Sequence, residues 1–209
     1  MSRIRQKNQE LIIEVACHLF AEQGYAATKM ADIAKQADIP KPNVYYYFST
    51  KDNLYRAVLN TVIQPLLEAS KPIELLDDPA EALTEYIKTK LRISRDHPDA
   101  SKVFANEVMS GAKSLPSDIA NELLVQSKMM VSKFETWSEQ GVMAKLSPQH
   151  LMFTIWAATQ TYADFSWQIC NVMDKPKLDD NDFADAADFL TQFVINGCQI
   201  KQREEAERL

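Results

Sequence analysis

Glycine is scarce in this chain, which has only four among its 209 residues. Sheet proteins rely on many tight turns in which glycine supplies positive backbone angles, and four glycines cannot furnish them. The nine prolines stand mostly where helices can begin, because proline is tolerated in the first helical turn. The composition therefore predicts an all-α fold of about nine helices joined by short loops.

Cysteine and histidine are equally few, with three of each. The cysteines are odd in number and widely spaced, and neither a CxxC motif nor a Cys/His metal spacing occurs. Disulfides and a metal site are therefore not expected, and a reducing cytoplasm is the natural compartment. Paired carboxylates or a Cys/His pair with catalytic spacing are also missing, so we expect no enzyme, no catalytic residue and no cofactor.

Long apolar runs are missing as well. The longest segment without a charge is 146–163, which reaches the length of a membrane helix. That segment contains Pro148, Gln149, His150 and Gln160, so a buried or interface helix is the better interpretation. The first apolar run of the chain is interrupted by Glu10 and Glu14, which argues against a signal peptide.

Negative charge predominates, with a formal net charge of −6, but it is unevenly distributed. Residues 1–57 carry eight basic and six acidic residues, whereas residues 58–209 carry 15 and 23. A mildly basic head on an acidic body is compatible with a small DNA-binding domain. We therefore divide the chain into a DNA-binding domain, 1–57, and a ligand-binding and dimerisation domain, 58–209.

The head has the periodicity of a helix-turn-helix. Apolar pairs recur every four residues from Leu11 to Phe20, and Gly24 stands where a helix-ending glycine belongs. Thr28 is the expected N-cap of a short second helix, and a turn through 38–40 leads to a third over 41–47. Ser49 marks the start of a fourth helix, which Pro65 is expected to end or kink.

Proline and glycine divide the rest of the chain. Helices are expected to open at 78–79, 97–98 and 147–148, to run from Pro116 to Gly141, and to end the fold from Phe183 onward. An acidic loop covers 175–182.

The third helix carries donors suited to DNA. A short helix can read a major groove only if its first turn projects hydrogen-bonding groups, and Lys41 and Asn43 lie there. Lysine donates to guanine and asparagine pairs with adenine through two hydrogen bonds. Tyr47 and Phe48 are expected mainly to pack, and a lysine such as Lys51, taken alone, is usually a solvated side chain.

The segment 28–54, with an Ile-Ala pair, Val-Tyr-Tyr-Tyr-Phe and then Ser-Thr-Lys, resembles the TetR family of bacterial regulators. Asp38 departs from the family pattern, which commonly has glycine in the turn, but aspartate tolerates a left-handed conformation. Pro40 replaces the frequent serine N-cap of the reading helix. The resemblance implies a ligand-responsive repressor on double-stranded, palindromic operator DNA. Its expected DNA contacts are Thr28, Lys29, Lys41, Pro42, Asn43, Tyr45, Tyr46 and Lys51.

The C-terminal part carries a second resemblance. Segments 90–104 and 147–165 are similar to pyrimidine-sensing members of the family. Trp156 and Gln160 lie one helical turn apart, and an indole with an amide suits a flat ring such as uracil or thymine. The resemblance makes them the expected effector contacts, with Phe104 as a pocket wall; Glu107 and Trp137 are further candidates. Taken without the resemblance, the two residues favour another interpretation, in which Trp156 packs in the core and Gln160 bridges dimer or backbone groups.

A homodimer follows from the same resemblance, through helices at about 148–170 and 182–200. Ala157, Ala158 and Ala163 are expected to permit close helix approach, and Ala186, Ala187, Phe189 and Phe193 to supply the facing surface. Two other classes compete, a helical enzyme and a helical interaction protein without DNA binding. Within the regulators, the alternative is a repressor that responds to an unrelated apolar or amphipathic effector.

Overall fold

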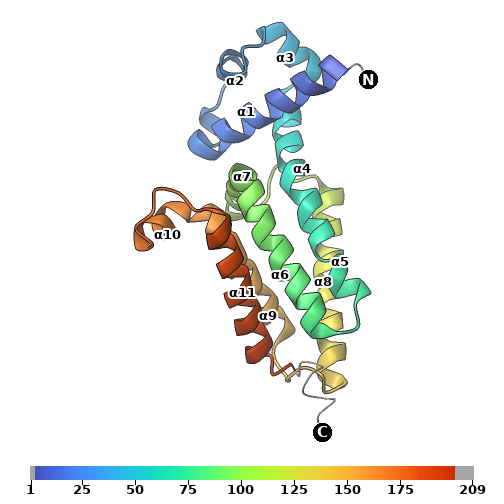
Figure 1. Cartoon of the computed structure of the whole chain (residues 1–209). Helices are drawn as coiled ribbons and strands as arrows, with labels where there is room; N and C mark the ends of the chain where they lie inside the picture. Colours follow the sequence, from blue (N-terminus) through green and yellow to red (C-terminus); the bar gives the residue numbers. More distant parts are fainter. Residues whose placement is uncertain (1–2, 201–209) are drawn as a thin grey trace. The chain divides into compact units, whose positions relative to one another are not determined.

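The computed structural model describes residues 3–200, and every regular element in that range is a helix (Figure 1). The predicted all-α class is confirmed. The helices are α1 (Arg3–Ala27), α2 (Met30–Gln36), α3 (Lys41–Tyr47), α4 (Lys51–Ala69), α5 (Lys71–Leu75), α6 (Pro79–Asp96), α7 (Pro98–Met109), α8 (Ser117–Glu139), α9 (Pro148–Asp164), α10 (Ser166–Val172) and α11 (Asp180–Gly197).

The count exceeds the predicted nine because α5 was not expected, and because the helix predicted over about 148–170 is divided at Phe165 into α9 and α10. Helices α5 and α10 have five and seven residues, which is too short for a helical period to become visible in the sequence. Within residues 3–200, no helix combines the length and the apolar character that crossing a bilayer requires. In the same range, no group of three or more His, Cys, Asp or Glu side chains is arranged so that it could bind a metal ion.

The chain forms two compact units, and each unit consists of two separate segments of the sequence. One unit runs to Gln64 and also includes His97–Ser117, and the other comprises Pro65–Asp96 and the chain from Asp118 onward. Helix α7 thus belongs with the N-terminal helices. The division into functional domains 1–57 and 58–209 stays a prediction, and the ends of both ranges, 1–2 and 201–209, lie outside the described residues.

In the first unit α1 packs against α2 and α7, and α2 packs against α3. The core contains Ile12, Phe20 and Leu54, all essentially inaccessible to solvent. At the surface of the α1–α7 contact, His18 Nδ1 lies 3.0 Å from Asp99 Oδ2, and this hydrogen bond raises the pKa of the imidazole.

In the second unit α6 is the central helix and packs against α5, α9 and α11. Its buried positions recur at Leu83, Ile87 and Leu91, the spacing of one helical face. On the neighbouring face Ser94 Oγ donates to the Thr159 carbonyl at 2.9 Å, which fixes α6 against α9. Trp137 is fully buried and stacks on Phe134.

Most predicted helix boundaries agree with the structure, and two caps need correction. Asp78 and Ser147 accept hydrogen bonds from first-turn amides, as their sequence context indicates. Thr28 does not cap α2, because the N-cap is Lys29 and carries no side-chain bond. The first turn of α4 is capped one residue later than predicted, since the Asn53 amide donates to Thr50 Oγ1 rather than to Ser49.

Pro65 neither ends nor visibly divides α4, which continues to Ala69. Of the two alternatives predicted for this proline, an end of the helix is therefore wrong, and a kink stays a prediction. Proline removes one backbone donor but leaves the other helical hydrogen bonds available. The second unit begins at this residue, so α4 is a continuous covalent connection between the two units.

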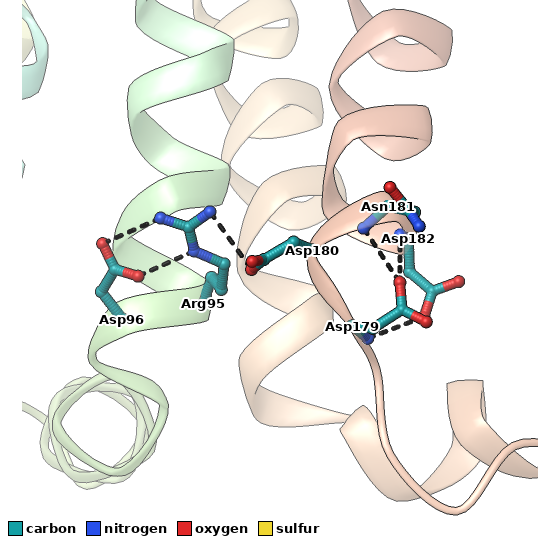
Figure 2. A network of polar contacts seen from close by, with 6 residues as sticks. All are labelled: Arg95, Asp96, Asp179, Asp180, Asn181 and Asp182. Carbon is teal, nitrogen blue, oxygen red and sulfur yellow. Dashed lines mark hydrogen bonds and ion pairs between the residues drawn. The ribbon is translucent and has the colours of Figure 1, made fainter.

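Helix α11 begins at Asp180, three residues before the predicted start, because a capping box fixes its first turn (Figure 2). The Asp179 carboxylate accepts from the amides of Asn181 and Asp182, at 2.9 and 3.2 Å, and the Asp182 carboxylate accepts from the Asp179 amide at 2.8 Å. Lys175 Nζ lies 2.6 Å from Asp182, and this hydrogen bond lowers the pKa of the Asp182 carboxyl.

Candidate nucleic-acid interface and effector site

The turn between α2 and α3 has the geometry that a helix-turn-helix requires. Asp38 adopts φ 52°, the left-handed conformation expected where glycine is usual. Pro40 occupies the N-cap position of α3 without a side-chain bond. Val44 and Phe48 are buried, so α3 is held to the unit by its inner side and its opposite side is left accessible.

The accessible side of α3 consists of predicted DNA contacts. Lys41, Pro42 and Asn43 in the first turn are exposed, as are Tyr45 and Tyr46 in the second. Tyr47 is half-buried, and Asn8 Nδ2 donates to its hydroxyl at 3.4 Å, which agrees with a mainly packing role. The structure therefore presents five of the eight predicted contacts on one short helix.

Basic side chains lie over both exposed tyrosines. Lys41 Nζ is 5.9 Å from the centre of the Tyr45 ring, and the Arg5 guanidinium carbon is 5.4 Å from the centre of the Tyr46 ring. Such cation–π contacts hold positive charge beside phenol hydroxyls. Arg5 was not among the predicted contacts, although the sequence signal, a basic residue near the start of the first helix, was visible.

Thr28 is placed differently from the expectation. The residue is buried, and its hydroxyl donates to the carbonyls of Leu19 and Gly24, at 3.2 and 2.9 Å. Its side chain closes the corner between α1 and α2. Lys29 is exposed at the N-terminus of α2, where a phosphate could be approached by its ammonium and the first amides of the helix.

Lys51 is tied to the same corner. Its ammonium donates to the carbonyls of Tyr25 and Thr28, at 2.8 and 3.0 Å, and lies 4.2 Å from the centre of the Tyr25 ring. Tyr25, whose hydroxyl also donates to Asp52, was not singled out from the sequence. Lys51 thus joins the start of α4 to the α1–α2 corner, a role beyond that of a solvated lysine.

Replacing Lys51 with methionine is expected to lower the free energy of unfolding by about 1.5–3 kcal/mol, because two charge-assisted hydrogen bonds are lost. Urea unfolding in the absence of DNA measures this, with the exposed Lys35→Met as control. Unchanged stability of Lys51→Met would contradict the structural role.

If Lys51 also contacts a phosphate, Lys51→Ala weakens binding to all DNA sequences alike and reduces the slope of log affinity against log salt concentration by about 1.

Helix α7 is joined to α4 inside the first unit. Tyr55 Oη donates to Glu107 Oε2 at 3.0 Å, and the other Glu107 oxygen accepts from the Ser114 amide at 2.5 Å. Burial is the main reason why the pKa of Tyr55 is raised, and its bond to Glu107 adds to it. Glu107, which sequence analysis considered as a pocket wall, is therefore a buried tie between α4 and α7.

The expected effector contacts on α9 adjoin α6. Trp156 is half-buried, and its indole Nε1 donates to the Tyr86 hydroxyl on α6 at 2.8 Å. Gln160, one turn further along α9, is also half-buried. Neither is a fully enclosed core residue. Tyr86, which is buried on α6 beside the apolar stripe, was missed in the sequence analysis. Trp137 is fully buried in the second unit. Phe104 belongs to the first unit, so its predicted role as a wall of the effector pocket stays a prediction.

A buried lysine lies on the same side of α6. Lys90 is only 5% exposed, and burial lowers the pKa of its ammonium to about 8, while the charge of Asp164 on α9 acts in the opposite direction. Lysine is rarely buried so completely without a polar partner. Tyr86, Lys90 and Ser94 are spaced by four residues, so a polar seam of α6 runs opposite α9.

The contribution of Lys90 to stability is expected to rise with pH between about 8 and the ordinary lysine value of 10.5. The unfolded chain keeps the proton in this window and the folded chain releases it, so unfolding takes up a proton that becomes scarcer as pH rises. Lys90→Met removes this contribution. In urea unfolding at pH 7.5, 9 and 10, the free energy of unfolding of the unmodified protein should increase relative to that of Lys90→Met as the pH rises. The exposed Lys88→Met is the control and should follow the unmodified protein; parallel profiles for Lys90→Met would contradict the account.

The outward faces of α9 and α11 carry exposed apolar side chains. Phe153 of α9 is 49% exposed, and on α11 Phe189 and Phe193 are 66% and 59% exposed, with their rings stacked. Ala163, Ala186 and Ala187 are buried within the unit. The prediction that Ala186 and Ala187 supply the facing surface is therefore wrong, and Ala163, predicted to permit close helix approach in the dimer, also lies on the inner side of its helix.

Comparison with known proteins shows relatives for both the N-terminal and the C-terminal part of the chain. The family described as "Bacterial regulatory proteins, tetR family" matches residues 12–58, and "YcdC-like protein, C-terminal region" matches residues 59–201. The HTH-type transcriptional regulator RutR of Escherichia coli (strain K12) is 33% identical over 196 residues, which cover 94% of this chain and 92% of RutR. The regulator QacR of Staphylococcus aureus is 42% identical over 52 residues, which cover 25% of this chain and 28% of QacR.

Solved structures with the same fold include the ketosteroid transcriptional regulator KstR2 of Mycobacterium tuberculosis. Its TM-score is 0.72 at 22% identity, with 97% of each chain covered. AibR, solved in complex with isovaleryl coenzyme A and operator DNA, has a TM-score of 0.67 at 16% identity, covering 89% of this chain and 97% of AibR. At these identities the likeness concerns the fold.

Proposed function

The chain belongs to the TetR family of bacterial regulators, and we propose that it is a repressor that releases a two-fold symmetric operator when a pyrimidine base binds. As a member of this family it is a ligand-responsive, DNA-binding transcriptional regulator. The pyrimidine effector, the residues that contact DNA and effector, and the homodimer are parts of the proposal.

The observation that carries DNA reading is the exposed face of α3. Lys41 and Asn43 are accessible in the first turn, while Val44 and Phe48 fix the opposite side of the helix in the core. A helix anchored in this way can enter a major groove with its first-turn donors toward the base edges. Tyr45 and Tyr46 are then suited to phosphates, which position the helix without reading sequence.

Asn43→Ala is expected to cost about 1–3 kcal/mol of operator affinity and to relax the preference at one base step, because a paired amide contact to adenine is lost. Selection of binding sites from random DNA, followed by affinity measurement, tests both effects. Asn53→Ala, an equivalent change at an exposed position of α4, is the control. If Asn43→Ala selects the same sequence as the unmodified protein, α3 does not read bases through Asn43.

The pyrimidine effector is supported by Trp156 and Gln160 on α9. A half-buried indole offers a stacking surface, and an amide offers two donors and an acceptor for the polar edge of a ring. The resemblance of segment 147–165 to pyrimidine-sensing family members favours the same ligand class. An apolar or amphipathic effector would draw little benefit from Gln160, so the response of a Gln160 variant separates the two alternatives.

The coupling of the effector to DNA runs along the chain. Helix α6, which packs against α9, leads through His97 directly into α7 of the first unit. Glu107 of α7 holds Tyr55 of α4, and α4 follows the DNA-reading helix. A ligand that favours one position of α6 therefore shifts the equilibrium between a DNA-binding and a DNA-releasing conformer, provided that its affinity differs between these two conformers.

A further inference from the structure

Helix α7 is bonded to the N-terminal helices near both of its ends. Toward its C-terminal end, Glu107 accepts the hydrogen bond from Tyr55 of α4 that the proposed coupling uses. In its first turn, Asp99 Oδ2 lies 3.0 Å from Nδ1 of His18 on α1. All four residues belong to the first unit. Asp99 follows the end of α6 by three residues, yet the proposed function gives its contact with His18 no role.

A second carboxylate faces the other ring nitrogen of His18. Glu22 lies one turn further along α1, and its Oε2 is 3.5 Å from Nε2 of the ring. An imidazolium donates from both nitrogens and can bind both carboxylates, whereas a neutral imidazole has only one N–H. In the neutral ring, one nitrogen directs a lone pair at a carboxylate, and the hydrogen bond that remains lacks the positive charge of the ring. The complete bridge therefore requires a protonated His18.

The charges around the ring favour this protonated state. Glu22 and Asp99 are negative, while Lys102 lies 4.0 Å from Asp99 on α7 and acts in the opposite direction. Within the described residues, α2 and α4 also contact α1 but add no charged group that acts on the imidazole. The neighbouring Cys17 stays neutral, because burial raises the pKa of its thiol to about 12. The hydrogen bond to Asp99 is the main reason why the pKa of His18 is raised above its ordinary value of 6.5.

Partial exposure sets the size of the effect. The three side chains of the bridge are between 37% and 59% exposed, so the ring exchanges its proton with water without any opening of the fold. Exposed ion pairs contribute little free energy. Ala100 and Val103 of α7 are buried and hold the helix in the unit by apolar contact. The bridge therefore modulates the contact between α1 and α7, whose existence does not depend on it.

We propose that His18, Asp99 and Glu22 form a pH-sensitive bridge between α1 and α7. At mildly acidic pH the imidazolium binds both carboxylates and fixes the first turn of α7 to α1. At higher pH the ring loses its proton and the bridge weakens. Since α7 carries the proposed signal from α6, a complete bridge makes α1 follow α7, and the effector then acts more strongly on the operator. This last consequence rests on the proposed function, whereas the bridge itself does not.

Histidine NMR tests the bridge in the absence of DNA and effector. The ring of His18 should titrate at a higher pH in the unmodified protein than in Asp99→Asn, because the variant lacks the negative charge beside Nδ1. His150, which is exposed on α9, is the internal reference and should titrate alike in the two proteins. A His18 titration that Asp99→Asn leaves unchanged would overturn the proposal.

The dependence of stability on pH gives a second readout. Because the pKa of His18 is raised on folding, the bridge contributes fully below the ordinary value of 6.5, and its contribution is lost as pH rises through the pKa of the folded protein. The urea midpoint of the unmodified protein should therefore exceed that of His18→Gln by more at about pH 5.5 than at about pH 8. His150→Gln is the control and should show no such change between the two pH values. A difference between the unmodified protein and His18→Gln that is independent of pH would contradict the bridge.

Operator release by uracil, measured at about pH 6 and pH 8, tests the regulatory consequence. Release from the unmodified protein should be stronger at the lower pH by about twofold or more, the scale of an exposed ion pair, and His18→Gln should lose this difference. Equal release from the unmodified protein at both pH values would overturn the regulatory role. If uracil releases operator DNA at neither pH, the proposed effector is wrong, and the histidine titration and the stability profile still decide whether the bridge exists.

Discussion

Replacing Phe189 and Phe193 together with aspartate is expected to convert the protein into a monomer and to weaken operator binding by at least a hundredfold. Both rings are largely exposed and stack on the outward side of α11. A monomer binds one half-site alone and loses the gain in effective concentration that links two reading helices. Sedimentation velocity and fluorescence anisotropy with an operator duplex measure the two effects.

The physical basis is the cost of leaving this surface in water. The rings of Phe189 and Phe193 are stacked and exposed on α11, Phe153 is exposed on α9, and exposed apolar surface of this kind usually marks an interface. Obligate interfaces bury about 2,000 Å² or more in total, and aspartate at the centre of such an interface would be left desolvated and unpaired. Two new charges therefore prevent association without altering the inner side of α11.

Leu75→Asp is the matched control for added charge. Leu75 is also strongly exposed but lies on α5, so this variant should remain dimeric and bind operator normally. If the Phe189/Phe193 variant sediments as a dimer, α11 does not form the interface. If the unmodified protein is a monomer at micromolar concentration, the dimer itself is excluded.

Gln160→Ala is expected to weaken the binding of uracil or thymine by about 1–3 kcal/mol, or roughly 5- to 150-fold, because the polar edge of the ring loses its partner. The operator affinity of the ligand-free protein should stay nearly unchanged, since Gln160 is remote in sequence from the reading helix. Calorimetry with each base on the unmodified protein and the variant measures the difference.

Gln168→Ala, an exposed glutamine on the neighbouring helix α10, is the control and should bind the bases as the unmodified protein does. If Gln160→Ala binds uracil and thymine undiminished, the effector class is right and the site is misplaced. If the bases bind neither protein, an apolar or amphipathic effector becomes the better account.

The head was largely predictable from sequence because its signals are local. A left-handed residue is needed between α2 and α3, and Asp38 is one of the few types that accept it. Packing was predicted for Tyr47 and Phe48, and Phe48 is buried while Tyr47 is half-buried. Thr28 was misassigned because threonine at a helix start suggests a cap, whereas its hydroxyl is taken by carbonyls of the preceding helix.

The body was less predictable because its decisive features are pairings between distant helices. The partnership of Trp156 with Tyr86 joins residues 70 positions apart, and no spacing within one helix announces it. Lys90 lies on the polar seam of α6, and its burial is not visible from the sequence of α6 alone. The alanines assigned to the dimer face were wrong for the same reason, since periodicity finds two sides of α11 without telling which one faces inward.

Operator binding measured across a titration with uracil and thymine tests the central claim most directly. Either base at up to millimolar concentration is expected to weaken operator affinity by about 5- to 150-fold, corresponding to a coupling of about 1–3 kcal/mol. Gln160→Ala should require more ligand for the same release. Operator affinity that neither base changes at millimolar concentration would contradict the pyrimidine-responsive repressor and leave only a TetR-family regulator of another effector.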